Sequence, residues 1–167
     1  MIFLLLGNII TIMINTTLCY IQQDESYLMI HRTKKEKDYN KDKWIGIGGK
    51  FEENESPKEC ARREIFEETG LTVNSLEYRG IVTFVSEDSS GTYYELMHLF
   101  WSDDFDSTTP LPDCSEGDLE WVPISKMNDL PHWEGDEIFL DLIARRVPFF
   151  SLKLIYKDGV LINSKLE

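Results

Sequence analysis

The sequence predicts one α/β domain, and three observations support this class. The chain has 167 residues, a length typical of a single domain with a substantial core. Apolar and β-branched runs of strand length alternate along it with two stretches of helical character. No internal repeat, low-complexity tract or interdomain linker interrupts this alternation.

The first elements of the domain are expected to be strands. They are predicted at 16–21 and 27–32, around a polar Gln-Gln-Asp-Glu turn, and a polar loop then runs to Lys43. A short strand starting at Trp44 should lead into a glycine-rich bend that ends at Gly49.

A helix is predicted next, over residues 57–69. Pro57 suits the first turn of a helix, where its missing N–H costs no hydrogen bond. Gly70 suits the left-handed position at which helices often end. The remaining elements are a loop marked by Pro110 and Pro112, a second helix, and strands on either side of it. We expect strands at 76–86, 92–101 and 119–122, the helix at 134–146, and a hairpin of 149–156 with 160–166 around Lys157-Asp158-Gly159.

Residues 1–14 are interpreted as an apolar N-terminal extension, followed by the folded domain at 15–167. The first 23 residues carry no charged side chain, yet Asn8, Thr11 and further polar residues interrupt the apolar run. Neither a positive leading segment nor a small-residue cleavage site is visible. Translation from Met13 is an alternative, and a membrane anchor is the less favoured one.

The net charge argues against a nucleic-acid-binding protein, and the cysteine spacing argues against a disulfide framework or a zinc site. A net charge of −13 argues against binding to nucleic-acid polymers. Residues 32–43 hold six basic side chains against three acids, whereas residues 80–125 hold ten acids and no Lys or Arg. The basic segment would attract a small anionic ligand. Three widely spaced cysteines without a C-x-x-C pair fit a reducing, cytoplasmic setting.

Three carboxylates define the candidate site. Glu64, Glu67 and Glu68 are spaced i, i+3 and i+4, so they leave one face of the predicted helix. Like charges held so close destabilise a bare helix. A hard divalent cation such as Mg²⁺, which takes oxygen ligands, would reverse that cost.

The segment from Gly49 to Leu71 resembles the Nudix box, G-x5-E-x7-R-E-aliphatic-x-E-E-x-G-aliphatic, with every position filled. The resemblance implies a Nudix-type α/β/α sandwich around a mixed β-sheet, with a catalytic loop-helix-loop. It also implies hydrolysis of a nucleoside diphosphate linked to another group, by water attack on phosphorus. Metal ligands would be the three box glutamates and the Gly49 carbonyl, binding Mg²⁺ or Mn²⁺. Glu55 and Arg63 match box positions that brace the loop against the helix.

Two residues outside the box complete the expected phosphate site. Nudix enzymes often add a carboxylate from another loop as a ligand or general base, and Glu116 is the candidate, five residues before Trp121. Catalytic roles are therefore expected for Glu67, Glu68 and Glu116, although Asp113, Asp118 and Glu120 compete with Glu116. Arg32, which ends the second strand, resembles the phosphate-contacting basic residue of the family.

Further segments are similar to the oxidised-purine nucleoside triphosphatases and to bacterial MutT-type 8-oxo-dGTP diphosphatases. These segments are W-I-G-I-G-G-K-F-E, L-P-H-W-E-G-D and the C-terminal hairpin. By this resemblance Trp133 would stack on a purine and Asp136 would hydrogen-bond its edge. Mammalian relatives place a base-reading asparagine after the tryptophan, where this chain has Ile45, a residue that neither donates nor accepts.

The sequence therefore predicts a cytoplasmic, Mg²⁺-dependent pyrophosphohydrolase that converts a nucleoside triphosphate to the monophosphate and pyrophosphate. Oxidised dGTP is the favoured substrate, which implies nucleotide-pool sanitation in support of DNA repair. Alternatives are hydrolysis of ADP-ribose or a dinucleoside polyphosphate, and a non-catalytic nucleotide-binding module. We expect no nucleic-acid polymer and no membrane as partner, and a monomer or homodimer.

Overall fold

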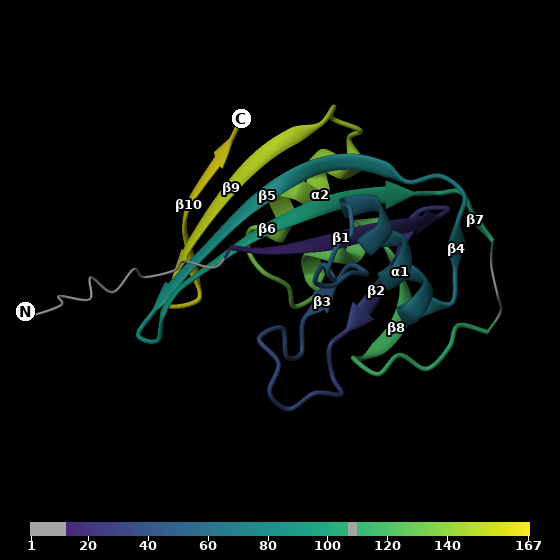
Figure 1. The fold of residues 1–167 in the computed structure, drawn as a ribbon, viewed down its shortest axis with the longest axis horizontal. Coiled ribbons are helices and arrows are strands. Elements are labelled where there is room, and N and C mark those ends of the chain that lie inside the picture. Colours follow the sequence, from purple (N-terminus) through teal and green to yellow (C-terminus); the bar gives the residue numbers. More distant parts are fainter. Residues whose placement is uncertain (1–12, 107–109) are drawn as a thin grey trace, which may run out of the picture.

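The computed structural model describes residues 13–106 and 110–167, and within them a strongly twisted mixed sheet lies between two helices (Figure 1). Along the sheet the strand order is β10-β9-β5-β6-β1-β2-β3, and β8 also pairs with β2. The β1–β6 and β5–β9 pairs are parallel, and the other pairs are antiparallel, so the predicted mixed sheet is confirmed. The strands are β1 (Met13–Gln23), β2 (Ser26–His31), β3 (Trp44–Ile45), β5 (Glu77–Asp88), β6 (Gly91–Ser102), β8 (Asp118–Pro123), β9 (Phe150–Lys157) and β10 (Val160–Leu166).

Helix α1 (Pro57–Thr69) has the bounds that the sequence predicts. At its start the Ser56 side chain accepts a hydrogen bond from the Glu59 backbone N–H, and the Glu59 carboxylate accepts one from the Ser56 N–H, which completes a capping box. At its end Gly70 adopts a φ of 70° and its N–H donates to the Phe66 carbonyl. These two caps fix where the carboxylate-bearing turns of the helix lie.

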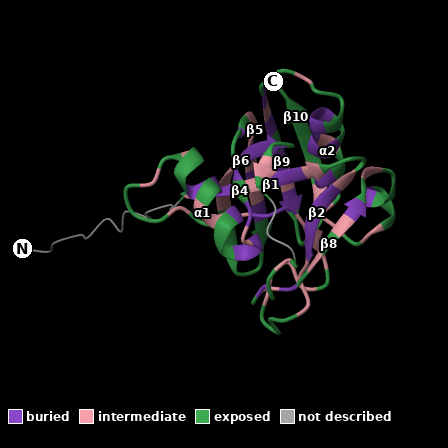
Figure 2. Cartoon of the chain, turned by 90° about the vertical axis from the view of Figure 1, so that its right-hand side faces the viewer, coloured by how far each residue is buried: buried purple, intermediate pink, exposed green. Residues whose placement is uncertain are grey.

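The sheet separates two apolar layers, as the predicted α/β/α sandwich requires. Side chains alternate along each strand, so Cys19 lies with α1 residues on one face, and Tyr20 lies with α2 (Asp136–Ala144) on the other. Ile65 of α1 and Phe139 of α2 are both completely buried. Figure 2 shows the buried sheet between the two helices, whose outward faces are exposed.

Several element boundaries differ from the predictions for identifiable reasons. Strand β1 begins at Met13 instead of residue 16, because its first residues pair with β6 from Tyr94 onward. Helix α2 is shorter than 134–146: Gly135 is its N-cap, and Arg146 adopts a left-handed φ of 55° that ends the helical path. The predicted C-terminal hairpin is confirmed.

Three short elements have no counterpart in the predictions. They are β4 (Thr72–Val73), its partner β7 (Phe105–Asp106), and a 3₁₀ helix at Ile124–Asp129. An isolated two-residue strand or short 3₁₀ helix carries too little periodicity to be found in a sequence. Strand β3, also two residues long, is predicted together with the glycine-rich bend that follows it. Of the predicted N-terminal extension, residues 1–12 lie outside the described residues. In the described part of the chain no helix is long and apolar enough to cross a membrane.

Candidate active site

A cleft of about 1070 Å³ joins the start of the α1 region to the open face of the sheet beside α2. One end is bounded by Gly48, Gly49 and Glu64, and the other by Trp133 and Asp136. Its volume lies at the upper end of the range of about 300–1,000 Å³ that is typical of small-molecule sites. The cleft is also lined by Arg32, Asp38, Tyr39, Asn40, Ile45, Arg63, Ser86, Glu95 and Glu116.

The glycine-rich bend brings backbone into contact with the α1 carboxylates. The Gly49 carbonyl accepts a hydrogen bond from the Thr17 N–H at 2.9 Å, which ties the bend to β1. A Cβ atom at Gly49 would lie 2.4 Å from Glu64 Oε1, so only glycine permits this approach. Gly48 donates its N–H to Glu68 Oε2 at 3.1 Å. The bend therefore lies against two of the three box glutamates, with the Gly48 N–H bonded to Glu68 and Gly49 packed against Glu64.

The three glutamates differ in environment although they share one helical face. Glu68 is only 8% exposed, whereas the Glu64 side chain is 14% exposed and the Glu67 side chain 57%. Burial, and then the nearby Glu64 carboxylate, raise the pKa of Glu68 to about 8. The site thus holds several carboxylates close together where burial disfavours their charged forms. A bound cation would offset that electrostatic cost.

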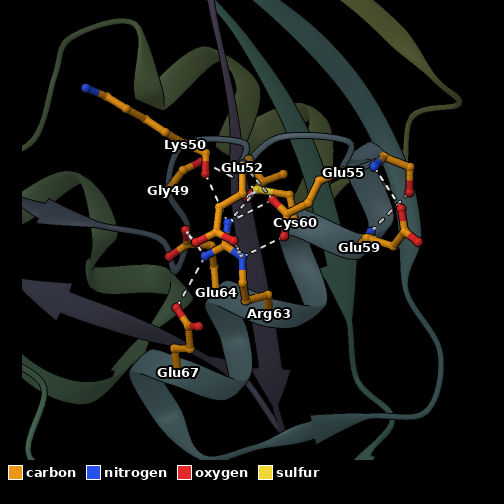
Figure 3. A network of polar contacts seen from close by, with 11 residues as sticks. Gly49, Lys50, Glu52, Glu55, Glu59, Cys60, Arg63, Glu64 and Glu67 are labelled. Carbon is orange, nitrogen blue, oxygen red and sulfur yellow. Dashed lines mark hydrogen bonds and ion pairs between the residues drawn. The ribbon is translucent and has the colours of Figure 1, made fainter.

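Arg63 is the centre of a polar network around these carboxylates (Figure 3). Its guanidinium donates to Glu55 through two hydrogen bonds, Nε to Oε1 at 2.6 Å and Nη2 to Oε2 at 2.9 Å, and to the Lys50 carbonyl at 3.0 Å. The pairing with Arg63 lowers the pKa of Glu55 to about 2. Nη1 also donates to Glu64 at 2.6 Å and to Glu67 at 3.2 Å. Glu55 and Arg63 therefore hold the loop to the helix in the geometry expected of bracing residues.

The donor set fits a hard cation, although the side chains are not gathered around one. No three His, Cys, Asp or Glu side chains in the described ranges lie close enough to form a metal site. The oxygens of Glu64, Glu67 and Glu68 and the Gly49 carbonyl are the ligand type that Mg²⁺ prefers. A cation binding there would compete with Arg63 for Glu64 and Glu67.

Arg32 and Glu116, predicted separately, are ion-paired with each other. Arg32 Nη1 donates to Glu116 Oε2, and Arg32 Nε donates to Asp38 at 2.7 Å. Lys35 donates to the other Glu116 oxygen at 2.5 Å. Both residues line the same cleft as Glu64, and their charges are engaged by protein groups.

The competing acids near Glu116 do not line the cleft. Asp113 and Asp118 lie 2.5 Å and 3.7 Å from Lys34 Nζ, and Glu120 is an exposed residue on β8. The basic segment (residues 32–43) is therefore ion-paired with the acidic segment (residues 80–125) at one edge of the cleft. The paired residues are about eighty positions apart in the sequence.

Trp133 and Asp136, the residues predicted to bind the base, line the other end of the cleft. Trp133 stacks on Tyr39, with ring centroids 4.9 Å apart and planes 21° from parallel, and Lys43 Nζ lies 4.4 Å from its ring centroid. A purine could stack on the Tyr39 side of Trp133 only after Tyr39 moved. Trp133 Nε1 also donates to Asn40 Oδ1 at 2.8 Å. Tyr39 and Asn40 also line the cleft but were not predicted as site residues. The signal that could have found them was an aromatic residue within an otherwise charged loop.

Asp136 is a buried acid at the first turn of α2. It is 9% exposed, and burial raises its pKa to about 7, although His132, the Trp133 backbone and Lys43 oppose that shift. Near neutral pH this carboxyl can therefore accept hydrogen bonds or, when protonated, donate one.

Comparisons with known proteins find relatives along most of this chain. The family model of the NUDIX domain matches residues 14–143. The oxidized purine nucleoside triphosphate hydrolase of Danio rerio is 29% identical over 133 residues, covering 80% of this chain and 83% of that protein. The uncharacterized Nudix hydrolase YvcI of Bacillus subtilis is 27% identical over 129 residues, covering 77% of this chain and 78% of that protein.

A solved structure extends the likeness to the C-terminal hairpin. The crystal structure of the MutT protein from Bacillus halodurans matches with a TM-score of 0.79 and 25% identity. The match covers 92% of this chain and 97% of that one. The whole sheet, and not only the box, is therefore shared with a MutT protein.

Proposed function

The chain belongs to the Nudix family of hydrolases that act on phosphoric anhydrides, and from this we propose that it is a Mg²⁺-dependent nucleoside triphosphate pyrophosphohydrolase. Its substrate would be oxidised dGTP, and its products 8-oxo-dGMP and pyrophosphate. This activity would remove damaged nucleotides before a polymerase could use them. The name of the Danio rerio relative and the MutT-like fold support the substrate class.

The proposal rests on one continuous cleft whose two ends differ in chemistry. Oxygen atoms that could ligate a metal lie at the Gly49–Glu64 end. Aromatic and hydrogen-bonding side chains lie at the Trp133–Asp136 end. A nucleoside triphosphate has the same polarity, with an anionic tail at one end and a flat heterocycle at the other. The cleft therefore suits a nucleotide lying along it.

The phosphate end would work through the box carboxylates. Bound there, Mg²⁺ would screen the phosphate charges and acidify the attacking water. Glu64, Glu67, Glu68 and the Gly49 carbonyl would hold the ion. Glu67, Glu68 and Glu116 are the groups proposed to take the proton from water.

Arg32 would contact the phosphates, since it lines the cleft and carries a charge that cannot be lost. In the described structure Asp38 and Glu116 engage its guanidinium. A phosphate chain would have to compete with Glu116 for it. Recruitment of Glu116 toward a cation would release Arg32 at the same time, which links the two proposed roles.

The test is a substrate panel with matched variants. Wild type would be incubated with Mg²⁺ and 8-oxo-dGTP, dGTP, dATP, ADP-ribose or a dinucleoside tetraphosphate, and the products separated by ion exchange. We expect monophosphate and pyrophosphate from 8-oxo-dGTP, with turnover lost in Glu67→Gln and Glu68→Gln. Faster turnover of ADP-ribose or the tetraphosphate would overturn the substrate. Equal inertness of wild type and both variants, with nucleotide still bound, would make the protein a binding module.

A further inference from the structure

Asn40, in the loop between β2 and β3, has a side-chain amide whose orientation is fixed by Trp133. Its Oδ1 accepts the Trp133 Nε1–H at 2.8 Å. The indole nitrogen can only donate, so the oxygen and not the nitrogen of the amide must face it. The two N–H donors of Nδ2 remain, and within the described residues no hydrogen bond from them is found. Asn40 is half-buried and lines the cleft, so these donors are accessible to a molecule bound there.

The backbone around Asn40 is held on both sides. The Asn40 N–H donates to Asp38 Oδ1 at 2.9 Å, and the Asn40 carbonyl accepts from the Lys43 N–H at 3.0 Å. Asp38 is itself held by Arg32 Nε at 2.7 Å. The Asn40 backbone is therefore held in place, although a purine stacking on the Tyr39 side of Trp133 would first have to displace Tyr39.

Other groups at this end of the cleft are already used or are of the wrong type. Ile45 lines the cleft but has no hydrogen-bonding side chain. The Tyr39 and Ser86 hydroxyls are bonded to each other at 3.1 Å. Glu95 is an acceptor and already takes hydrogen bonds from two hydroxyl groups. Asn40 is thus the side chain in this group with two uncommitted donors, because the Tyr39–Ser86 pair uses one hydroxyl hydrogen and leaves one.

We propose that Asn40 determines base specificity by donating a hydrogen bond from its amide to a ring carbonyl oxygen of a purine that stacks on Trp133. The identity of the ligand rests on the function proposed above. Oxo-purines carry such an acceptor at C6 or C8, whereas adenine carries an amino group at C6 that would meet the Asn40 donors with another donor. The loop residue supplies the hydrogen bond that Ile45 cannot make.

Two substitutions separate base reading from mere positioning of Trp133. Asn40→Asp keeps an oxygen to accept the Trp133 N–H but loses both donors, whereas Asn40→Ala loses both functions. Asn163→Asp, on exposed β10, adds the same charge away from the cleft. Dissociation constants for 8-oxo-dGMP, dGMP and dAMP would be measured by calorimetry, so that no turnover is needed. All three ligands carry the same phosphate, so the effect of the added charge on the phosphate cancels in their ratios. The new carboxylate can also accept a hydrogen bond from the adenine amino group, so the same ratios are measured for Asn40→Ala, which adds no charge.

We expect Asn40→Asp to weaken binding of the oxo-purines relative to dAMP by tenfold or more, with Asn163→Asp unchanged. A loss confined to 8-oxo-dGMP would place the bonded oxygen at C8, and an equal loss for dGMP would place it at C6. Ratios equal to wild type in Asn40→Asp, with Asn40→Ala weakening all three ligands equally, would reduce Asn40 to a support for Trp133 and overturn the inference. If wild type hydrolysed no triphosphate but these ratios still shifted, the proposed function would fail and the inference would stand.

Discussion

Replacement of Asp136 by asparagine should stabilise the protein increasingly as pH rises. The pKa of this carboxyl is raised from its ordinary 3.8 to about 7, because folding buries it at 9% exposure. A group whose folded pKa lies above its unfolded pKa contributes full stability below pH 3.8 and loses it as pH rises through about 7. The isosteric amide cannot ionise, so it avoids the cost of a buried charge.

The magnitude follows from the two pKa values. A difference of about three pKa units at 1.36 kcal/mol each sets an upper limit of about 4 kcal/mol. His132, the Trp133 backbone and Lys43 favour the charged form, and the pKa of about 7 already includes their opposing effect. Between pH 5 and 7 the unfolding free energy of the variant should therefore gain on wild type by about 1 kcal/mol per pH unit.

The assay is urea unfolding of wild type and Asp136→Asn at four pH values between 5 and 8, without metal or nucleotide. Taking the difference between the two proteins cancels the titration of every other group, Glu68 included. Glu134→Gln, an exposed carboxylate just before the same helix, is the matched control and should show no trend. The argument from burial would be refuted if the unfolding free energies of wild type and Asp136→Asn changed in parallel with pH. It would also be refuted if the variant became less stable relative to wild type as pH rises.

Three further predictions concern the box. Mg²⁺ at ten times its dissociation constant should stabilise wild type by about 1.4 kcal/mol, a few degrees in melting temperature, and Glu68→Gln should lose that shift; an equal shift in the variant would exclude this carboxylate as a ligand. Arg63→Ala should lower the unfolding free energy by about 2 kcal/mol or more, because it leaves Glu55 without the partner of its two hydrogen bonds. Urea unfolding of Arg63→Ala and Arg63→Lys would show whether lysine fails to restore the lost stability. Gly48→Ala should cost about 3 kcal/mol in the same assay, since its Cβ would lie 2.0 Å from the Thr17 carbonyl oxygen; unchanged stability would contradict the close packing of the bend on β1.

The elements with strong local signals were predictable from sequence. Helix α1 has a proline and a glycine at its ends, and the structure places it at the predicted residues. The C-terminal hairpin has an Asp-Gly turn, in which Asp158 and Gly159 adopt positive φ angles of 49° and 79°. In both cases one or two residues restrict the backbone without help from the rest of the fold.

From residue spacing alone, the site was predictable only where its residues are close in sequence, and the more distant candidates came from the resemblance to a family. The box glutamates share one helix, so their spacing alone placed them on one face. The Arg32–Glu116 pair joins residues 84 apart, and the Tyr39–Trp133 stack joins residues 94 apart. Such contacts depend on how β2, β8 and the loop after β2 meet across the sheet, which no local pattern encodes. For the same reason the burial that raises the pKa of Asp136 was invisible before the fold was known.

The ratio of kcat/KM for 8-oxo-dGTP to that for dGTP, measured with purified wild type and Mg²⁺, tests the central claim most directly. We predict a ratio of one hundred or more, about 2.7 kcal/mol of discrimination between the two transition states. This ratio should fall in Asp136→Asn, while Glu68→Gln should reduce turnover of both substrates together. A ratio near one in an active wild-type enzyme would contradict the claim that the Trp133–Asp136 end of the cleft selects oxidised purines.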